Sequence, residues 1–291
     1  AHARRAHAAS SARVDDVDRD GACRDRRVDP DRSRGNALNE GDLSLAGADL
    51  RGCEGVLLLT GAVGVALPGG KGGGRGGVRA PALSLRATAA VANGKRLADA
   101  KAELLAQADG NLAAFLKARD PKRPFFFWHG PTNVHRKWVK GSGKALWGID
   151  PDALTGKLPK FLPDVPEVRE DFADYLGEAQ AFDAQVGVLL NRLKGAGELD
   201  NTLVFISGDH GAPGFPGGKC NLYDFGVGVA LVVAGPRVPG PRVVDDLANL
   251  MDLAPTFLDA AGVKQPDGLN GKSLWPVLTS TKSGQVDPAR T

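Results

Sequence analysis

Asp209 and His210 stand side by side between two glycines, and a single cation, Lys219, follows them in a loop rich in Gly and Pro. A carboxylate and an imidazole can bind a metal ion, and one ammonium group can hold an oxyanion. These three side chains therefore suggest a site for a metal ion and an oxyanion. The same Asp-His-Gly sequence equally suits a turn in which the aspartate caps backbone N–H groups, because motifs this short recur by chance.

The segment just before this motif predicts the element that positions it. Residues 202–207 are apolar on both faces of a strand and rich in β-branched side chains. Such a run is typical of a central strand that is covered on both sides. Open α/β sheets bind ligands just beyond the carboxyl ends of their strands, so we expect Asp209 and His210 at that edge of the sheet.

Strands and helices alternate along the rest of this region. The predicted elements are, in chain order, helix 97–116, strand 125–128, helix 166–193, strand 202–207, strand 227–234 and helix 253–261. Asp252 is expected to cap the last helix, and the Gly-, Pro- and Lys-rich residues 139–165 are expected to form a long loop. This alternation predicts the α/β class, with a mainly parallel central sheet and helices on both faces.

Residues 1–90 differ in composition from the rest of the chain. They contain no Phe, Trp, Tyr, Ile or Met and are crowded with Arg, Gly, Ala and Asp. They therefore have little apolar surface whose burial could offset the conformational entropy lost on folding. Only 56–67 could form a strand or buried turn, and the glycine run 69–77 predicts a linker rather than a phosphate loop. We therefore expect a disordered or out-of-frame segment 1–90, an α/β domain 91–280 and a tail 281–291.

Composition also limits the partners. The formal net charge of +3 is too small to predict nucleic-acid binding. No apolar run approaches the ~20 residues that span a bilayer, and no secretory signal is visible. Cys23, Cys53 and Cys220 are scattered and form no C-x-x-C pair, which argues against a disulfide framework or a zinc cluster. The compartment and the oligomeric state stay open.

Several short motifs follow one another between residues 91 and 280. They are the strand exit 124–135, the turn 197–202, the Ser-Gly-Asp-His-Gly motif 207–211, the Gly-Lys and Tyr-Asp pairs 218–219 and 223–224, the helix 251–263, and the Gly-Lys-Ser-Leu sequence 271–274. In this order they resemble the C-terminal portion of the catalytic domain of sulfatases, in the alkaline-phosphatase superfamily. Residues 130–147 further resemble a subgroup often labelled heparan N-sulfatase.

The resemblance implies roles for four residues. Asp209 and His210 would bind a divalent cation, and calcium is the expected ion. Calcium prefers oxygen ligands, so His210 matches it less well than Asp209 does. Lys219 would hold a sulfate oxygen, and His135 would lie near the leaving-group oxygen and assist its departure by proton donation or hydrogen bonding. The implied reaction is hydrolysis of a sulfate ester or N-sulfate on a small sulfated sugar or a glycosaminoglycan.

The nucleophile that the resemblance calls for is missing from these 291 residues. Sulfatases use a formylglycine made from Cys or Ser in a C-x-P-S-R type of motif, and none of the three cysteines stands in one. Asp15 and Asp16 follow no buried strand, so they do not match the two N-terminal metal-binding aspartates of the family. We therefore expect negligible turnover from the chain as written. Two alternatives stay open: a phosphatase or phosphodiesterase of the same superfamily, and a non-catalytic remnant.

Each side chain near these motifs also has a structural interpretation. His135 taken alone suits a loop histidine bonded to a backbone carbonyl, and His129 is expected to be structural. Arg136, Lys137 and Lys140 are expected to form a solvated basic rim, and a sulfated polysaccharide would also favour such charges. Trp138 and Trp147 suit either stacking on a sugar ring or anchoring of the loop.

Overall fold

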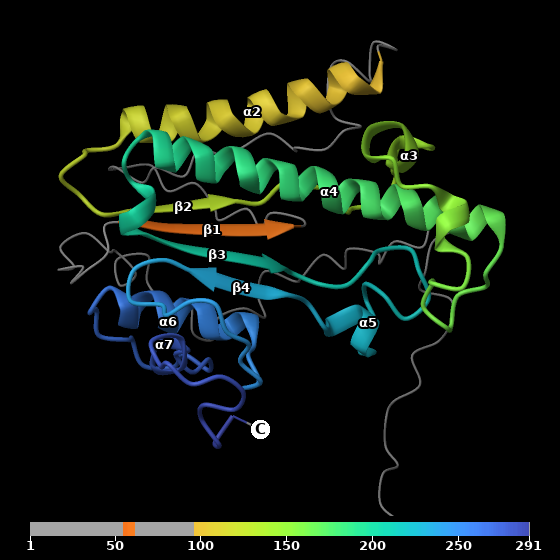
Figure 1. Cartoon of the computed structure of the whole chain (residues 1–291). Helices are drawn as coiled ribbons and strands as arrows, with labels where there is room; N and C mark the ends of the chain where they lie inside the picture. The colour runs from red at the N-terminus through yellow and green to blue at the C-terminus, as the bar shows by residue number, and fades with distance from the viewer. Residues whose placement is uncertain (1–54, 62–95, 291) are drawn as a thin grey trace, which may run out of the picture. The chain divides into compact units, whose positions relative to one another are not determined.

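A four-stranded sheet forms the centre of the computed structural model, which describes residues 55–61 and 96–290 (Figure 1). The strand order is β2-β1-β3-β4. The first three strands are parallel and the fourth pairs antiparallel to its neighbour. The strands are β1 (Gly55–Gly61), β2 (Phe125–His129), β3 (Thr202–Gly208) and β4 (Leu231–Ala234).

Helices cover both faces of this sheet, as the sequence predicts. In Figure 1, α2 and α4 lie on one side of the sheet and α6 and α7 on the other. The α-helices are α2 (Leu97–Ala118), α3 (Ser142–Trp147), α4 (Pro166–Gly195), α5 (Asp224–Val227), α6 (Leu253–Ala260) and α7 (Trp275–Leu278). Short 3-10 helices are η3 (Pro151–Leu154), η4 (Leu199–Asn201) and η5 (Leu250–Asp252). Among the described helices, none combines the length and apolar character needed to cross a membrane.

Side chains of β3 explain why both faces must be covered. Val204 packs into the core formed with α2 and α4, whereas Leu203 and Phe205 pack into the core formed with α6 and α7. Successive strand residues point to opposite faces, so an apolar run makes both faces hydrophobic. Each fully buried side chain of this size contributes about 1.5–3 kcal/mol of transfer free energy.

The sheet aligns the carboxyl ends of its three parallel strands. Gly61 at the end of β1 pairs with Gly208 at the end of β3, and Leu59 of β1 pairs with His129 at the end of β2. The segments that leave β2 and β3 therefore start from one edge of the sheet. That edge is where the Asp-His motif was expected.

β1 lies within the compositionally unusual segment 1–90, at the position predicted to form a strand or buried turn. It occupies the place between β2 and β3. The other features predicted for this segment, the glycine run 69–77 and the charged pair Asp15 and Asp16, lie outside the described residues.

Residues 139–165 do not form the long loop that was expected, because they contain α3 and η3. The two ends of α3 are capped by Gly141 and Gly148, both with positive φ. The carboxylate of Asp174, on α4, accepts hydrogen bonds from the N–H groups of Gly141 and Gly143, each over 2.8 Å. This tertiary support stabilises a helix that is too short to be stable from local interactions.

The strand predicted over 227–234 also begins later than expected, at Leu231. Its first residues belong instead to α5 and the segment after it, because α5 is held by a hydrogen bond from Gly211 N–H to Gly226 O over 2.8 Å. Apolar content alone did not reveal this tertiary contact.

Asp252 does not cap α6 with its side chain, contrary to the prediction. Its carboxylate accepts hydrogen bonds from the N–H groups of Asn249 (3.1 Å) and Lys272 (2.8 Å) and pairs with Arg290 (3.0 Å). Arg290 is buried, so the end of the stretch set apart as a tail, 281–291, contacts the domain. The carboxylate thus makes one local contact, with Asn249, and two long-range contacts, with Lys272 and Arg290.

Candidate functional site

The Asp-His motif begins immediately beyond β3, and its glycine allows α5 to approach it. Gly211 donates a hydrogen bond from its N–H to Gly226 O over 2.8 Å. A Cβ added at Gly211 would collide with the carbonyl oxygen of Phe225. Only glycine fits this close approach of two backbones. The contact holds Asp209 and His210 in a fixed turn between β3 and α5.

The loop that carries Lys219 folds back onto the start of the motif. Lys219 donates its backbone N–H to Ala212 O over 3.0 Å, closing the loop. Gly218 packs directly on the same carbonyl group, and a Cβ at that position would collide with it. The ammonium group of Lys219 lies near enough to Asp209 to favour its charged form. The structure thus brings together three of the four residues predicted for the site.

His210 is held in a form that leaves one ring nitrogen available. Its Nδ1 lies 2.9 Å from Gly211 O, and a carbonyl oxygen only accepts, so Nδ1 carries the proton. In the neutral ring Nε2 then presents a lone pair. That atom lies 3.5 Å from Asp209 Oδ2. Metal-binding histidines commonly use their second nitrogen in this way, to fix the ring orientation.

Two atoms of the Asp-His pair are buried without a hydrogen-bond partner. They are Asp209 Oδ1 and His210 Nε2. Burial raises the pKa of Asp209, while the side chains of His210 and Lys219 act in the opposite direction. Buried polar atoms are nearly always paired, so an unpaired oxygen and an unpaired nitrogen lone pair at one place fit a bound cation. The residues therefore pass a chemical test for holding a metal ion.

The pair supplies only part of a coordination shell. Within residues 55–61 and 96–290 there is no group of three or more His, Cys, Asp or Glu side chains that could hold a metal ion. β1, which ends at Gly61 beside Gly208, contains no acidic residue. In the described part of the chain, no third His, Cys, Asp or Glu side chain thus joins Asp209 and His210.

His135 lies on the turn that follows β2, and its side chain is exposed. Its backbone N–H bonds to Thr132 O over 3.0 Å, and its Nδ1 bonds to Arg136 O over 2.8 Å. No hydrogen bond or ion pair joins it to Asp209 or Lys219 in the part of the chain that the structure describes. Its place in the site stays a prediction.

Arg136 is not the solvated rim residue that was expected. Its guanidinium bonds to both carboxylate oxygens of Asp171, each over 2.5 Å, and stacks on Trp138 at 4.0 Å from the ring centroid. Trp138 in turn packs against Tyr175 and Phe215. The structure therefore shows Trp138 as an anchor of the loop. Sequence patterns gave no sign of this arrangement, because its members are far apart in the chain.

A chain of buried polar side chains lies beneath the same turn and was also missed. His129 Nε2 is 3.2 Å from Gln185 Oε1, Gln185 donates to Asn133 Oδ1 over 2.7 Å, and Asn133 donates to Glu178 Oε2 over 2.6 Å. All four side chains are at most 2% exposed. The available signal was helical spacing, because Asp174, Glu178 and Gln185 share one face of α4.

Burial changes the titration of two members of this network. Desolvation lowers the pKa of His129 to about 4, opposed by its bond with Gln185. Desolvation raises the pKa of Glu178 to about 7, opposed by the bond from Asn133 and assisted by the nearby charge of Asp174. His129 is therefore a neutral buried residue, in keeping with the structural role expected for it.

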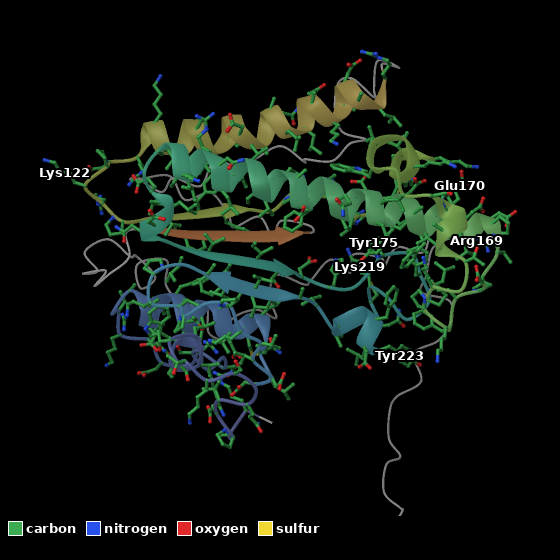
Figure 2. The ribbon with its side chains drawn as sticks, in the orientation of Figure 1. Lys122, Arg169, Glu170, Tyr175, Lys219 and Tyr223 are labelled. Atoms are coloured by element: carbon green, nitrogen blue, oxygen red, sulfur yellow. The ribbon has the colours of Figure 1, made fainter. Side chains whose placement is uncertain are left out.

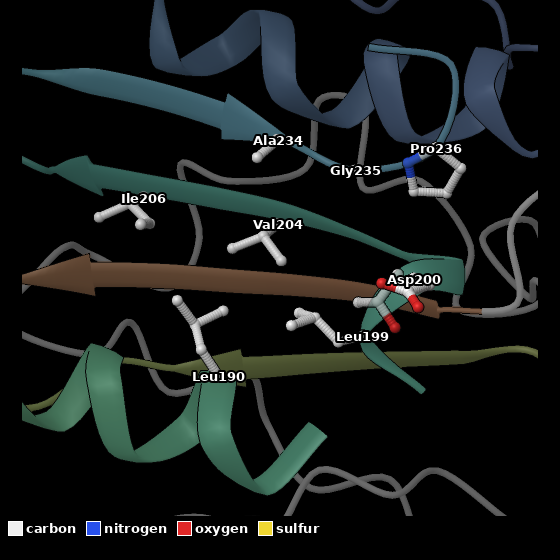
Figure 3. A pocket seen from close by; sticks show the side chains of 9 residues that line it. Leu190, Leu199, Asp200, Val204, Ile206, Ala234, Gly235 and Pro236 are labelled. Carbon is white, nitrogen blue, oxygen red and sulfur yellow. The ribbon is translucent and has the colours of Figure 1, made fainter. Parts of the chain in front are cut away.

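A groove of about 460 Å³ lies along β3 but has the wrong chemistry for an anion (Figure 3). Its lining residues are Leu190, Leu199, Asp200, Thr202, Val204, Ile206, Ala234, Gly235 and Pro236. Its only charged side chain, Asp200, is negative. The groove extends from η4, before the first residue of β3, whereas the Asp-His motif follows the last. The candidate site is thus the cluster around Asp209 rather than this groove.

The fold and the motif agree with the family comparison. The sequence model of the Sulfatase family matches residues 91–263, which is more than half of the chain. The chain belongs to the sulfatase family.

Two relatives show which members it is similar to. N-sulphoglucosamine sulphohydrolase of Homo sapiens is 32% identical over 193 residues, covering 56% of this chain and 38% of that protein. N-acetylglucosamine-6-O-sulfatase of Bacteroides thetaiotaomicron is 37% identical over 163 residues, covering 54% of this chain and 28% of that protein. The chain therefore spans less than half the length of these curated relatives.

Solved structures agree on the fold. A Bacteroides thetaiotaomicron structure titled for the metabolism of multiple glycosaminoglycans has a TM-score of 0.50 at 24% identity, and covers 65% of this chain and 41% of that one. The Bacteroides fragilis structure of yidJ, titled as a sulfatase candidate, has a TM-score of 0.50 at 20% identity and covers 62% and 41%. At such identities the likeness shows the fold alone.

Proposed function

We propose that this chain carries part of a sulfatase-type site, which binds the sulfate group of a sulfated sugar beside a divalent cation. The observation that carries the proposal is the pair of buried, unpartnered atoms, Asp209 Oδ1 and His210 Nε2, next to the cation Lys219. Two metal-ligand atoms and one ammonium group beyond the end of a central strand suit a metal ion and an oxyanion together.

Each residue has a distinct chemical task in this proposal. Lys219 holds a sulfate oxygen as a compact positive charge. Asp209 and His210 hold the metal ion, which when bound would polarise the sulfate and stabilise charge on an attacking oxygen. Calcium is the ion that the family resemblance implies, the carboxylate of Asp209 also suits Mn²⁺, and the nitrogen of His210 also suits Zn²⁺.

His135 would assist departure of the leaving group. Its Nδ1 proton is used by Arg136 O, so the neutral ring presents Nε2 only as an acceptor. Donation to a leaving-group oxygen therefore requires the imidazolium form of His135.

The proposed substrate class is a small sulfated sugar or a glycosaminoglycan. Support comes from the names of two relatives, N-sulphoglucosamine sulphohydrolase and N-acetylglucosamine-6-O-sulfatase. The exposed lysines of the turn after β2, Lys137 and Lys140, would attract such an anion.

We further propose that the chain as sequenced turns over sulfate esters negligibly. Its 291 residues contain no formylglycine motif, and no third His, Cys, Asp or Glu side chain joins the Asp-His pair among the described residues. Without a nucleophile, binding of sulfate and polarisation of its oxygens do not lead to a covalent intermediate.

A binding experiment tests the site directly. Isothermal titration calorimetry would follow glucosamine N-sulfate binding to the wild type in the presence of Ca²⁺ or Mn²⁺, and to Lys219→Ala. We expect at least a tenfold weaker affinity in this variant, because a charge-assisted contact to the anion is lost. Lys122→Ala is the matched control, since Figure 2 shows Lys122 at the left edge of the molecule, away from Lys219. Equal loss in both variants, or no binding to the wild type, contradicts the proposed site.

An activity assay tests the predicted absence of turnover. Hydrolysis of an aryl sulfate would be measured with and without calcium, with an aryl phosphate run in parallel. We expect neither substrate to be hydrolysed above background. Robust aryl sulfate turnover would contradict the missing nucleophile, whereas turnover of the phosphate alone would favour the phosphatase alternative.

A further inference from the structure

We propose that Arg136 is a positioning residue, which holds the turn carrying His135 against the loop carrying Lys219. This inference rests on the proposed function for the ligand that the two residues would share. It assigns a task to an arginine that no motif singled out, one residue after the predicted leaving-group histidine.

The first contact fixes the guanidinium of Arg136 to α4. Nη1 and Nη2 donate to the two carboxylate oxygens of Asp171, each over 2.5 Å. A bidentate pair of this kind defines the orientation of the guanidinium plane as well as its position. α4 is packed on the sheet through its apolar core, so Asp171 gives Arg136 a rigid support.

The second contact joins Arg136 to the loop between His210 and Lys219. Its Nη2 lies 3.4 Å from Gly214 O, and its guanidinium is 5.2 Å from the ring centroid of Phe215. Gly214 has a φ of +77°, and a Cβ there would collide with Arg136 Nε. The loop backbone therefore touches the guanidinium at a position where a side chain would prevent it.

Aromatic packing encloses this junction. Arg136 also stacks on Trp138, which contacts Phe215 and Tyr175, and Phe215 contacts Phe225 of α5. One guanidinium thus contacts α4, the turn after β2 and the loop after β3. Because the last two carry His135 and Lys219, its geometry sets how these two side chains are placed relative to each other.

The exposure of the pair separates positioning from stability. The side chains of Arg136 and Asp171 are 33% and 38% exposed, and ion pairs that reach solvent contribute little to global stability. Loss of this Arg136–Asp171 contact, which we call the clamp, should therefore make the turn after β2 and the loop after β3 open more easily. The domain should stay folded. Lysine keeps the positive charge but lacks the planar guanidinium group. Arg136→Lys therefore removes the two-pronged contact with Asp171 while it retains the charge.

Hydrogen exchange in the ligand-free protein tests the clamp without any assay of the proposed function. In Arg136→Lys and in Asp171→Asn we expect the amides of 211–219 to exchange about tenfold faster, because local opening of this loop becomes easier. The amides of β3 should stay as protected as in the wild type. The matched control is Arg192→Lys, because Arg192 on the same helix makes a two-pronged contact with Asp109, through Nε over 2.8 Å and through Nη2.

Affinity for glucosamine N-sulfate is the second measurement. We expect it to fall at least fivefold in Arg136→Lys and to stay unchanged in Arg192→Lys. Unchanged exchange in 211–219 overturns the inference, because Arg136 would then not hold this loop. Exchange that rises equally in β3 also overturns it, because Arg136 would then stabilise the whole domain. If the wild type does not bind the sugar, the proposed function fails while the exchange experiment still decides on the clamp.

Discussion

The two halves of α4 bury different kinds of side chain. The apolar half, residues 186–195, places Leu189 and Leu193 in a core with β2 and β3, and both are fully buried. The polar half, residues 166–185, buries Asp174, Glu178 and Gln185 together with small residues. Buried hydrogen-bonding side chains are therefore confined to one end of this continuous helix.

The difference shows that the two halves of α4 hold different neighbours in place. An unpaired buried polar group costs about 1–3 kcal/mol, so each carboxylate of the polar half needs a partner. Those partners are loop atoms: the N–H groups of Gly141 and Gly143 for Asp174, and the amide of Asn133 for Glu178. The polar half thus fixes loops near the candidate site, whereas the apolar half fixes the helix on the sheet.

The largest expected effect lies in the apolar half. Leu189→Ala should lower the free energy of unfolding by about 2–5 kcal/mol, because the side chain is fully buried and leaves a cavity. Urea denaturation measures it, and the loss should be the same at pH 5 and pH 8. A loss below about 1 kcal/mol would mean that this half does not carry the stability assigned to it.

The second effect is a pH dependence in the polar half. Glu178 has a pKa of about 7 in the folded protein, raised by burial from an ordinary value of 4.5. Its contribution to stability is therefore complete below pH 4.5 and is lost as pH rises through 7, by up to about 3 kcal/mol. Glu178→Gln removes this titration, so its stability relative to the wild type should rise between pH 5 and pH 8.

Unfolding curves of both proteins at the two pH values test this difference. His129 acts with the opposite sign, because its lowered pKa stabilises the fold above pH 6.5 and this is lost as pH falls through 4. It is present in both proteins and largely cancels in the difference. Glu170→Gln is the control on the same helix, since Glu170 forms an exposed pair with Lys140. An equal pH response in this control would refute the role of burial.

The smallest expected effect belongs to an exposed ion pair of the apolar half. Arg192→Lys weakens the contact with Asp109 of α2, whose pKa that contact lowers. The change in denaturation midpoint should be close to experimental error, and it should shrink further in 0.5 M salt because exposed charges are screened. A large, salt-independent loss would show that surface charge, rather than the apolar core, joins α2 to α4.

The spacing of apolar residues was sufficient to predict those helices and strands in which that spacing is regular from end to end. Apolar spacing located α2, α4, β2 and β3 to within a few residues, and the alternation of types indicated an α/β sheet covered on both faces. Residues whose contacts are local were also predictable, because Asp209, His210 and Lys219 lie on one loop. Where the chain returns to itself from a distance, as at Asp252 and around α3, prediction from spacing was wrong.

By itself the sequence determined the family and the strand that ends at the Asp-His motif, and it predicted the roles of Asp209, His210 and Lys219. Only the tertiary structure decided that Arg136 joins two loops, that β1 lies between β2 and β3, and that Glu178 and His129 are buried in one polar network. The physical reason is that hydrogen bonds and desolvation depend on neighbours in space, and these neighbours are separated by tens of residues in the chain.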